Sequence, residues 1–359
     1  MMNSIVIDSV EIGAGNKPYI IAELSANHNG SIERAFESIS VAKAMGADAV
    51  KIQTYTPDTM TIDSSQEGFV INGGLWDGYN LYELYKEAHT PFEWHADLFA
   101  HAKKIGITLF SSPFDETAIA LLEGLNAPAY KVASFELVDI PLIQALADTN
   151  KPLIMSTGMA NFEEIGEAVE AAKSGGCKEI ILLHCISGYP VPVDQANLLS
   201  IPLLKKEFGC LVGLSDHTLG TSVSVAAAAL GASVIEKHFT LDRADKGPDS
   251  EFSLEPSELK TLCEDTQSAW QALGVANSER SEIESTNRQF RRSLYFVEDL
   301  SAGEVVEKKH VRRIRPGFGI APKYFDDVMG CVVTKNITRG TPVSWDCIRN
   351  ESADVVSND

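Results

Sequence analysis

The sequence contains no long hydrophobic run, and this excludes one class of protein. No stretch of about 18 or more consecutive apolar residues occurs, so no transmembrane helix is expected. The first residues, MMNSIVIDSVEIG, contain no basic segment followed by an apolar stretch, so no secretory signal is expected either. We therefore expect a cytoplasmic protein.

Cysteine and basic residues are also scarce. The six cysteines form no C-x-x-C pair and are too sparse for a disulfide scaffold, so reduced thiols are expected. The 30 Lys and Arg residues are outnumbered by 50 Asp and Glu residues, which gives a formal net charge of −20. This charge disfavours nucleic acid and anionic membranes as partners, although local lysines can still bind a small anionic substrate.

Short β-rich apolar segments alternate with longer amphipathic segments over most of the chain. This alternation predicts βαβ units, and eight units in roughly 250 residues predict an α/β protein with a (β/α)8, or TIM, barrel. The alternative, an open doubly wound sheet, is disfavoured because no G-x-G-x-x-G follows the first strand. The eight predicted strands cover residues 19–24, 49–53, 108–113, 129–134, 153–158, 179–185, 211–217 and 234–239.

Three further regions are predicted around this barrel. Residues 4–12 alternate apolar and polar side chains and predict a hairpin or plug at one end of the barrel, so that this domain would cover residues 1–275. The polar stretch 276–290 predicts a linker. Residues 291–359 predict a small β-rich domain that ends in a flexible tail.

Two local features refine this outline. The loop after the second predicted strand is long, and a long loop at that place on a barrel usually serves the active site. In the small C-terminal domain, the turns Asp299 to Gly303 and Asn336 to Gly340 resemble each other and suggest a weak internal repeat.

Polar side chains end nearly every predicted strand, and the carboxyl ends of barrel strands form the active face. Buried unpaired Lys or Glu side chains are costly, so Lys51, Lys131, Glu23 and Glu236 need partners. The lysines could simply pair with the glutamates. Alternatively, both lysines could bind one anionic ligand together with neighbouring hydroxyls, a combination that suits phosphate.

His217 and His238 end two adjacent predicted strands. Imidazoles in this arrangement can share one divalent cation and leave coordination sites for water and substrate, whereas a lone histidine is more often structural. Asp249, in a Gly-Pro-Asp segment after the last strand, could aim a carboxylate at substrate hydroxyls or at metal-bound water. An ordinary turn is an equally good interpretation of that segment.

The polar strand ends carry a resemblance to a known family. IAELSANHNGS, AVKIQTY, FSSPFD, AYKVAS, STGM, LLHCISGYP, VGLSDHT and IEKHFT resemble, in this order over about residues 15–255, the sialic acid synthase family of phosphoenolpyruvate-condensing enzymes. RRSLY and RIRPGFG resemble the C-terminal antifreeze-like (SAF) domain of that family.

The resemblance implies a transferase that condenses phosphoenolpyruvate with an amino-sugar aldehyde and water. The long second loop and SANHNG resemble the branch that uses 2,4-diacetamido-2,4,6-trideoxy-L-altrose. N-acetylmannosamine or a legionaminic acid precursor is the alternative sugar. Another metal-dependent barrel enzyme, such as a class II aldolase, is a rival. A non-enzymatic carbohydrate-binding protein would leave the polar strand ends unexplained.

The resemblance also implies roles for individual residues. His217 and His238 would hold Mn2+ or Mg2+, and Glu23 would handle a proton or orient water or sugar. The protein would be a homodimer in which the SAF domain reaches the active site of the partner subunit. Phosphoenolpyruvate would be bound by Lys51, Ser112, Lys131, Ser134, Ser156 and Ser215. The sugar would be contacted by Gln53, Ser187, Tyr189 and Asp249, with Phe290 and Arg315 supplied by the SAF domain.

Overall fold

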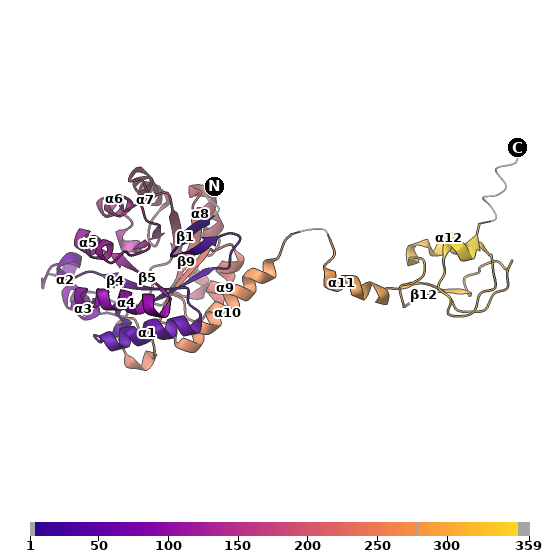
Figure 1. Ribbon diagram of the computed structural model, residues 1–359, viewed down its shortest axis with the longest axis horizontal. Helices are drawn as coiled ribbons and strands as arrows, with labels where there is room; N and C mark the ends of the chain where they lie inside the picture. Colours follow the sequence, from indigo (N-terminus) through magenta and orange to yellow (C-terminus); the bar gives the residue numbers. More distant parts are fainter. Residues whose placement is uncertain (1–3, 277–278, 351–359) are drawn as a thin grey trace. The chain divides into compact units, whose positions relative to one another are not determined.

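The computed structural model describes residues 4–276 and 279–350. The chain forms two compact units, which divide between Gly274 and Val275 and are treated separately here as the barrel unit and the C-terminal unit (Figure 1). Among the described residues, no helix is both long enough and apolar enough to cross a membrane.

Eight parallel strands in the barrel unit close into a barrel, in the order β10-β3-β4-β5-β6-β7-β8-β9. This confirms the predicted (β/α)8 fold, and each predicted strand overlaps an observed one. The strands are β3 (Tyr19–Glu23), β4 (Ala49–Thr54), β5 (Thr108–Pro113), β6 (Tyr130–Val132), β7 (Leu153–Ser156), β8 (Ile180–Cys185), β9 (Leu211–Asp216) and β10 (Val234–His238).

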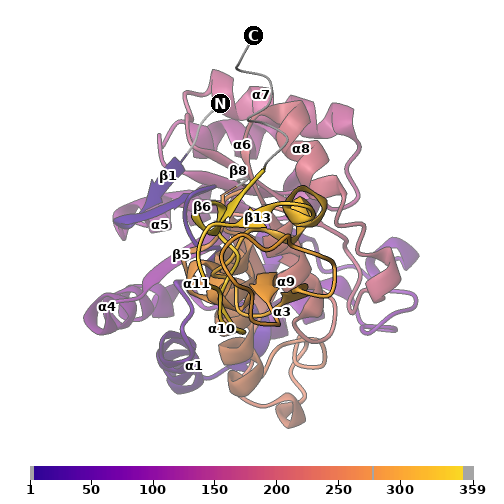
Figure 2. The same cartoon turned by 90° about the vertical axis from the view of Figure 1, so that its right-hand side faces the viewer.

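Helices surround the barrel, as the two views of the ribbon show (Figures 1 and 2). Helix α7 illustrates how the sequence sets their ends. The Asn161 side chain accepts a hydrogen bond from the Glu164 backbone N–H, and the Glu164 carboxylate accepts one from the Asn161 backbone N–H, which forms a capping box. The helices are α1 (Ile32–Met45), α2 (Pro57–Met60), α3 (Leu81–Ala88), α4 (His95–Ile105), α5 (Glu116–Gly124), α6 (Ile140–Ala147), α7 (Phe162–Ser174), α8 (Ser200–Phe208), α9 (Ser222–Ala229) and α10 (Pro256–Leu273).

An N-terminal hairpin of β1 (Ser4–Ile7) and β2 (Val10–Gly13) closes the end of the barrel where the strands begin. Ile5, Ile7 and Ile12 are buried in one cluster with apolar side chains from the barrel strands, including Phe110 and Ile181. This burial excludes water from that end, so only the opposite end is left for a polar site.

Side-chain alternation along the strands separates two environments. On β9 and β10, Ser215 and Glu236 are hydrogen-bonded to each other, whereas Asp216 and Lys237 form an ion pair of 2.8 Å. Asp216 also accepts a hydrogen bond from Ser224 in α9, so this ion pair faces the helices. The fully buried pair ties together the two strands that carry the paired histidines.

The C-terminal unit is β-rich, as predicted. Its strands form two antiparallel pairs around an apolar cluster that includes Leu294, Phe296 and Val333. Its elements are α11 (Glu282–Asn287), β11 (Ser293–Phe296), β12 (Val311–Ile314), α12 (Phe325–Val328), β13 (Val332–Val333) and β14 (Ile348–Arg349).

The two similar turns of this unit pair with each other. Leu300 and Ile337 form an antiparallel bridge with two backbone hydrogen bonds. Asp299 accepts a hydrogen bond from the backbone N–H of Arg339 at 2.6 Å, and Asn336 accepts one from Ala302 at 2.9 Å. The repeated sequence pattern therefore corresponds to a reciprocal structural pairing.

Gly213 in β9 provides a test of barrel packing. A Cβ at this position would lie 2.4 Å from the Val234 backbone oxygen and 2.9 Å from the Val234 Cβ. Gly213→Ala should therefore destabilise the barrel by about 1–3 kcal/mol, because close-packed neighbours must shift. Urea unfolding followed by tryptophan fluorescence measures this. Gly124→Ala in α5 is the control, since its Cβ would meet nothing within 4 Å. Equal stability of Gly213→Ala and the wild type would contradict this packing.

Candidate active site

Four charged side chains meet inside the barrel near the carboxyl ends of the strands. Lys51 Nζ lies 3.0 Å from Glu23 Oε2 and 3.5 Å from Glu236 Oε2, and Lys131 Nζ lies 4.0 Å from Glu236 Oε1. Each of the four residues is at most 5% exposed. The lysines thus pair with the glutamates as the simpler interpretation expected, and the four form one cluster, called here the charge cluster.

Burial and ion pairing act in opposite directions on the pKa values of the charge cluster. Burial raises the pKa of Glu23 despite the attraction of Lys51. Burial acts to raise the pKa of Glu236 as well, but Lys131 and Lys51 outweigh it and lower that pKa. Likewise, the carboxylates of Glu23 and Glu236 outweigh the effect of burial on Lys51 and raise its pKa. Burial lowers the pKa of Lys131 despite the attraction of Glu236. The cluster therefore couples two lysines to two carboxylates, and the lysine ammonium groups can also pair with an anionic ligand.

Serine hydroxyls surround the charge cluster. Lys51 donates to Ser112 Oγ at 3.3 Å, Ser215 donates to Glu236 at 3.0 Å, and Ser134 accepts from the Gly158 backbone N–H at 3.1 Å. The hydroxyls of Ser156 and Ser187 are buried and have no hydrogen-bond partner among the described residues. Because an unpaired buried hydroxyl costs about 1–3 kcal/mol, these two groups indicate a polar ligand that completes the site.

His217 and His238 lie side by side on the neighbouring strand ends, with ring centroids 5.4 Å apart. His217 Nδ1 lies 3.0 Å from the Ile186 carbonyl oxygen, which favours a proton on Nδ1 and a free lone pair on Nε2. Burial, aided by His217 and nearby lysines, keeps the pKa of His238 well below its usual range. Its buried Nδ1 has no hydrogen-bond partner among the described residues.

These features fit a divalent cation. Two neighbouring imidazoles can hold one divalent cation while water and substrate complete its coordination. Burial acts to lower the pKa of His217, but Cys185 and the Ile186 carbonyl outweigh it and raise that pKa, so a cation would have to displace any proton on the ring. Among the described residues, no group of three or more His, Cys, Asp and Glu side chains could hold a metal ion. The residues present would thus supply two ligands and leave the remaining positions open.

The predicted sugar-contacting residues of the barrel unit are linked around the histidines. The Tyr189 ring lies 4.4 Å from the His217 ring. Gln53 donates to Glu23 at 2.9 Å and to Ser25 at 3.0 Å, and Ser25 donates to Asp249 Oδ2 at 2.5 Å. Asp249 Oδ2 is itself 4.0 Å from His238 Nδ1. A continuous polar surface therefore runs from the charge cluster past the histidines to the mouth of the barrel.

Two predicted site residues belong to the C-terminal unit. Phe290 is 56% exposed, and Arg315 is also exposed. Whether they contribute to the barrel site of a partner subunit stays a prediction.

The sequence interpretation missed the importance of two acidic residues. Glu236 was considered only as a pairing partner for a lysine, yet it contacts both lysines and Ser215. Glu136, in the turn that follows β6, was not considered at all. Its Oε2 is buried without a partner, and burial raises its pKa to about 7 despite the attraction of Lys131. The only sequence signal for Glu136 is its position two residues after Ser134.

The barrel, its charged and hydroxyl-lined site and the paired histidines at the strand ends define the class: a (β/α)8 enzyme with a site for a small polar substrate. The NeuB family model matches residues 38–278, and the SAF domain model matches residues 291–349. The chain therefore belongs to the NeuB family, the sialic acid synthases that its sequence resembles, and it is a transferase.

Individual relatives agree with this assignment. The chain is 44% identical over 332 residues to the pseudaminic acid synthase of Helicobacter pylori (strain ATCC 700392 / 26695), covering 92% of this chain and 98% of the relative. It is 46% identical over 324 residues to the pseudaminic acid synthase of Campylobacter jejuni serotype O:23/36, covering 90% and 94%. Among solved structures, the N-acetylneuraminic acid synthetase of Leptospira borgpetersenii in complex with citrate matches with a TM-score of 0.72 and 32% identity, covering 79% of this chain and 95% of that chain.

Glu136 generates a pH-dependence prediction. A carboxyl whose pKa rises from 4.5 to about 7 on folding destabilises the fold progressively as pH rises through that window. Glu136→Gln cannot ionise, so its stability relative to the wild type should increase by about 2–3 kcal/mol between pH 5 and pH 8. Urea unfolding of both proteins at several pH values measures this difference. Glu37→Gln, at an exposed position, is the control and should show no such trend. A constant difference between Glu136→Gln and the wild type would show that Glu136 is ionised throughout.

Proposed function

We propose that the protein is a pseudaminic acid synthase, which condenses phosphoenolpyruvate with 2,4-diacetamido-2,4,6-trideoxy-L-altrose and water to give pseudaminic acid and phosphate. The observation that carries the reaction type is the charge cluster with its unpartnered hydroxyls, directly beside the paired histidines. The choice of sugar is supported by 44% and 46% identity to two pseudaminic acid synthases over at least 90% of the chain.

Phosphoenolpyruvate carries a phosphate and a carboxylate, and the charge cluster offers two lysines for these groups. Lysine ammonium groups and hydroxyls donate to phosphate oxygens and form the stronger, charge-assisted type of hydrogen bond. The binding groups are Lys51, Ser112, Lys131, Ser134, Ser156 and Ser215. When the substrate binds, its anionic groups would replace the glutamates as partners of Lys51 and Lys131. Both lysines would therefore be paired before and after binding.

The reaction needs one carbon–carbon bond, one water and one leaving group. Carbon 3 of the enol bonds to the aldehyde carbon, whose oxygen gains a proton. Water adds to carbon 2, and the carbon–oxygen bond to phosphate breaks. A divalent cation held by His217 and His238 would supply Lewis acidity to the aldehyde oxygen. Glu23, near Gln53 and Lys51, is placed to orient the water or accept its proton, and Glu136, partly protonated near neutral pH, can donate a proton to the departing phosphate.

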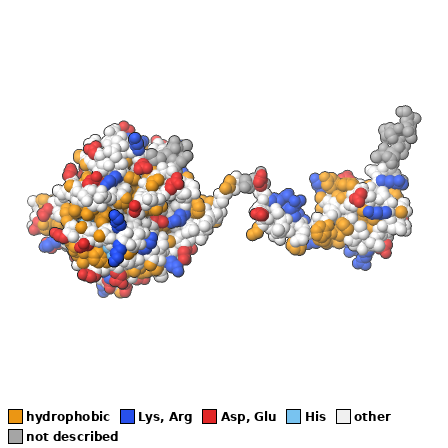
Figure 3. Space-filling view, in the orientation of Figure 1, with side chains coloured by type: hydrophobic (Ala, Val, Ile, Leu, Met, Phe, Trp, Pro, Cys, Tyr) orange, Lys and Arg blue, Asp and Glu red, His pale blue; other side chains and the backbone are white. Residues whose placement is uncertain are grey.

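Exposed apolar residues support a homodimer in which the C-terminal unit of one protomer reaches the active site of its partner. Phe135, Met159, Leu199 and Leu219 follow β6, β7, β8 and β9, and each is more than half exposed. In the C-terminal unit, Phe318 near Arg315 is 67% exposed. Hydrophobic side chains are visible on the surfaces of both units (Figure 3). Exposed apolar patches of this kind are typical of interaction surfaces.

Charge also favours this association. Residues 1–274 contain 17 Lys and Arg against 37 Asp and Glu, whereas residues 275–359 contain 13 of each. The acidic barrel unit would therefore be attracted to basic side chains such as Arg315. We place the protein in the cytoplasm, which the free state of all six cysteines supports.

The direct test is phosphate release from phosphoenolpyruvate with three purified sugars. The L-altrose derivative should give the highest kcat/KM, above N-acetylmannosamine and the 2,4-diacetamido sugar that leads to legionaminic acid. Chelation of divalent metal should abolish turnover, and Mn2+ or Mg2+ should restore it. Preference for N-acetylmannosamine would overturn the sugar assignment. The absence of phosphate release with every sugar would overturn the reaction itself.

Mixing two inactive variants tests the homodimer. Arg315→Ala should lose most of its activity with sugar, and His217→Ala should lose its metal site. If Arg315 acts on the partner barrel, a mixed dimer contains one complete site, so unfolding and refolding an equimolar mixture should restore about 25% of wild-type activity. Each variant refolded alone is the control. Failure of a verified mixed dimer to regain activity would show that Arg315 does not act across the interface.

A further inference from the structure

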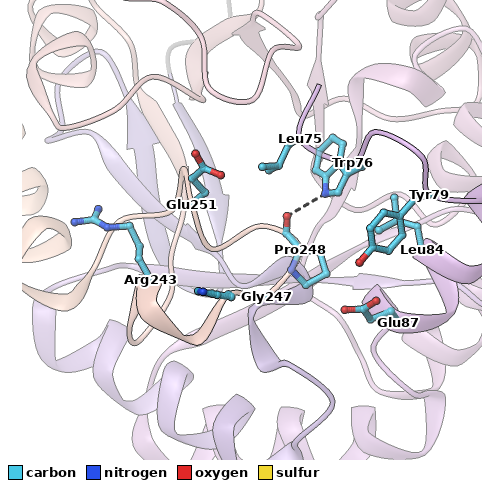
Figure 4. A pocket seen from close by; sticks show the side chains of 10 residues that line it. Leu75, Trp76, Tyr79, Leu84, Glu87, Arg243, Gly247, Pro248 and Glu251 are labelled. Carbon is cyan, nitrogen blue, oxygen red and sulfur yellow. Dashed lines mark hydrogen bonds between the residues drawn. The ribbon is translucent and has the colours of Figure 1, made fainter. Parts of the chain in front are cut away.

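A cavity of about 450 Å3 lies beside the site described above, and none of the roles assigned so far uses it. It is formed between the long loop after β4 with helix α3 and the loop after β10 (Figure 4). Its walls combine aromatic, aliphatic and charged side chains. The lining residues used below are Leu75, Trp76, Tyr79 and Pro248.

Trp76 connects this cavity to the paired histidines. Its indole N–H donates a hydrogen bond to the Pro248 carbonyl oxygen at 3.0 Å, as the dashed line in Figure 4 shows. Its ring centroid lies 5.4 Å from that of Tyr189, which lies 4.4 Å from that of His217. Pro248 directly precedes Asp249, whose carboxylate is 4.0 Å from His238. Trp76 is therefore linked to His217 through Tyr189, and to the neighbourhood of His238 through the Pro248–Asp249 segment.

The chain between β4 and α3 is built to hold Trp76 in place. Gly73 and Gly74 have φ values of 86° and 77°, a backbone conformation that favours glycine. The Gly73 backbone N–H donates to Asp77, and the Ile71 backbone N–H donates to the Tyr79 carbonyl oxygen at 2.9 Å. These contacts form a closed turn with Trp76 at its centre.

The length of the substrate places its far end at this turn. An open-chain six-carbon sugar spans roughly 6 Å from carbon 1 to carbon 6, given carbon–carbon bonds of about 1.5 Å. If the aldehyde lies at the histidine pair and the sugar extends along Tyr189, whose ring lies between those of His217 and Trp76 at 4.4 and 5.4 Å, carbons 4 to 6 would reach Trp76. In the proposed substrate this end carries a 4-acetamido group and a 6-methyl group, where N-acetylmannosamine carries hydroxyls.

We infer that Trp76 is a specificity-determining residue, whose indole ring packs against the 4-acetamido and 6-deoxy end of the sugar, with the adjoining cavity as room for the acetamido group. This inference rests on the proposed function and names the part of the site that selects the sugar. Aromatic rings provide large apolar contact areas for methyl groups, whereas the hydroxyls of N-acetylmannosamine would gain little from that contact. Leu75, beside Trp76 in the cavity wall, extends the apolar surface.

The test compares Trp76→Ala, Trp76→Phe and Tyr82→Ala with the wild type. Trp76→Ala should lower kcat/KM for the L-altrose derivative by roughly tenfold or more, the effect expected when an apolar pocket loses its contact with a substrate group. Trp76→Phe keeps a ring but not the hydrogen bond to Pro248, so it should retain most of the activity. Tyr82→Ala is the control: Tyr82 is an aromatic residue of the neighbouring helix α3 that does not line the cavity and donates to Asp58 instead, so its loss should leave sugar selectivity unchanged. The KM for phosphoenolpyruvate should not change in any variant.

N-acetylmannosamine is measured alongside, as a substrate or as a competitive inhibitor. Trp76→Ala should change its constants by less than about threefold, because only its hydroxyls face the ring. An equal loss for both sugars would overturn the inference and leave Trp76 as a support for the loop. A tenfold loss in Tyr82→Ala, which lies outside the cavity, would overturn it as well. Circular dichroism of each variant checks that the fold is retained.

The wild-type measurements separate this inference from the proposed function. If the wild type prefers the legionaminic acid precursor, the proposed sugar is wrong, but that sugar also carries 4-acetamido and 6-deoxy groups and tests Trp76 in the same way. If the wild type prefers N-acetylmannosamine, both proposals are overturned. If the L-altrose derivative is preferred and Trp76→Ala retains the full preference, only the inference about Trp76 is overturned.

Discussion

The burial of Lys51, Lys131, Glu23 and Glu236 inside the barrel is the constraint on which the site depends. Charged groups removed from water are tolerated only when they are paired and hydrogen-bonded. The three contacts of 3.0, 3.5 and 4.0 Å between these residues satisfy that requirement in the unliganded protein. These contacts also fix the positions of the two lysine ammonium groups. The lysines that stabilise the unliganded site by pairing with the glutamates are therefore those that an anionic substrate would contact.

The fold makes this concentration of charge possible. The N-terminal hairpin seals one end of the barrel with apolar side chains, and the helices cover the outside. Strand alternation then directs Ser215 and Glu236 inward and Asp216 and Lys237 outward, where the latter pair joins β9 to β10. A shift of either strand by one residue would exchange the two sets, so the outer ion pair and the inner site depend on the same register.

Much of this arrangement could be predicted from the sequence, because the order and orientation of the strands depend on the periodicity of apolar residues. Apolar segments of strand length alternating with helices are sufficient to predict the barrel, and the position of a polar residue at a strand end predicts that it faces the mouth. This reasoning correctly brought His217 and His238 together, since adjacent strands end at the same level. It also placed Lys51 and Lys131 within one cluster.

Periodicity does not predict contacts made by turns and long loops. Glu136 lies in a short turn after β6, where no repeat indicates which side chain points inward. Trp76 lies in a long irregular loop, and its contacts with Pro248 and Tyr189 join segments more than 110 residues apart in the sequence. Its location depends on where the loop folds back over the barrel, which local patterns do not encode. The positions of Phe290 and Arg315 in an assembled dimer depend on a second chain and are likewise beyond such patterns.

The most direct test of the account is the affinity for phosphoenolpyruvate in the absence of sugar, measured by isothermal titration calorimetry. Lys131→Met removes one lysine of the charge cluster, whereas Lys151→Met removes a lysine that pairs with Glu123 away from the cluster. The account predicts that Lys131→Met weakens binding by about tenfold or more and that Lys151→Met leaves it unchanged. Unaltered affinity in a folded Lys131→Met protein would contradict the assignment of this cluster as the phosphoenolpyruvate site.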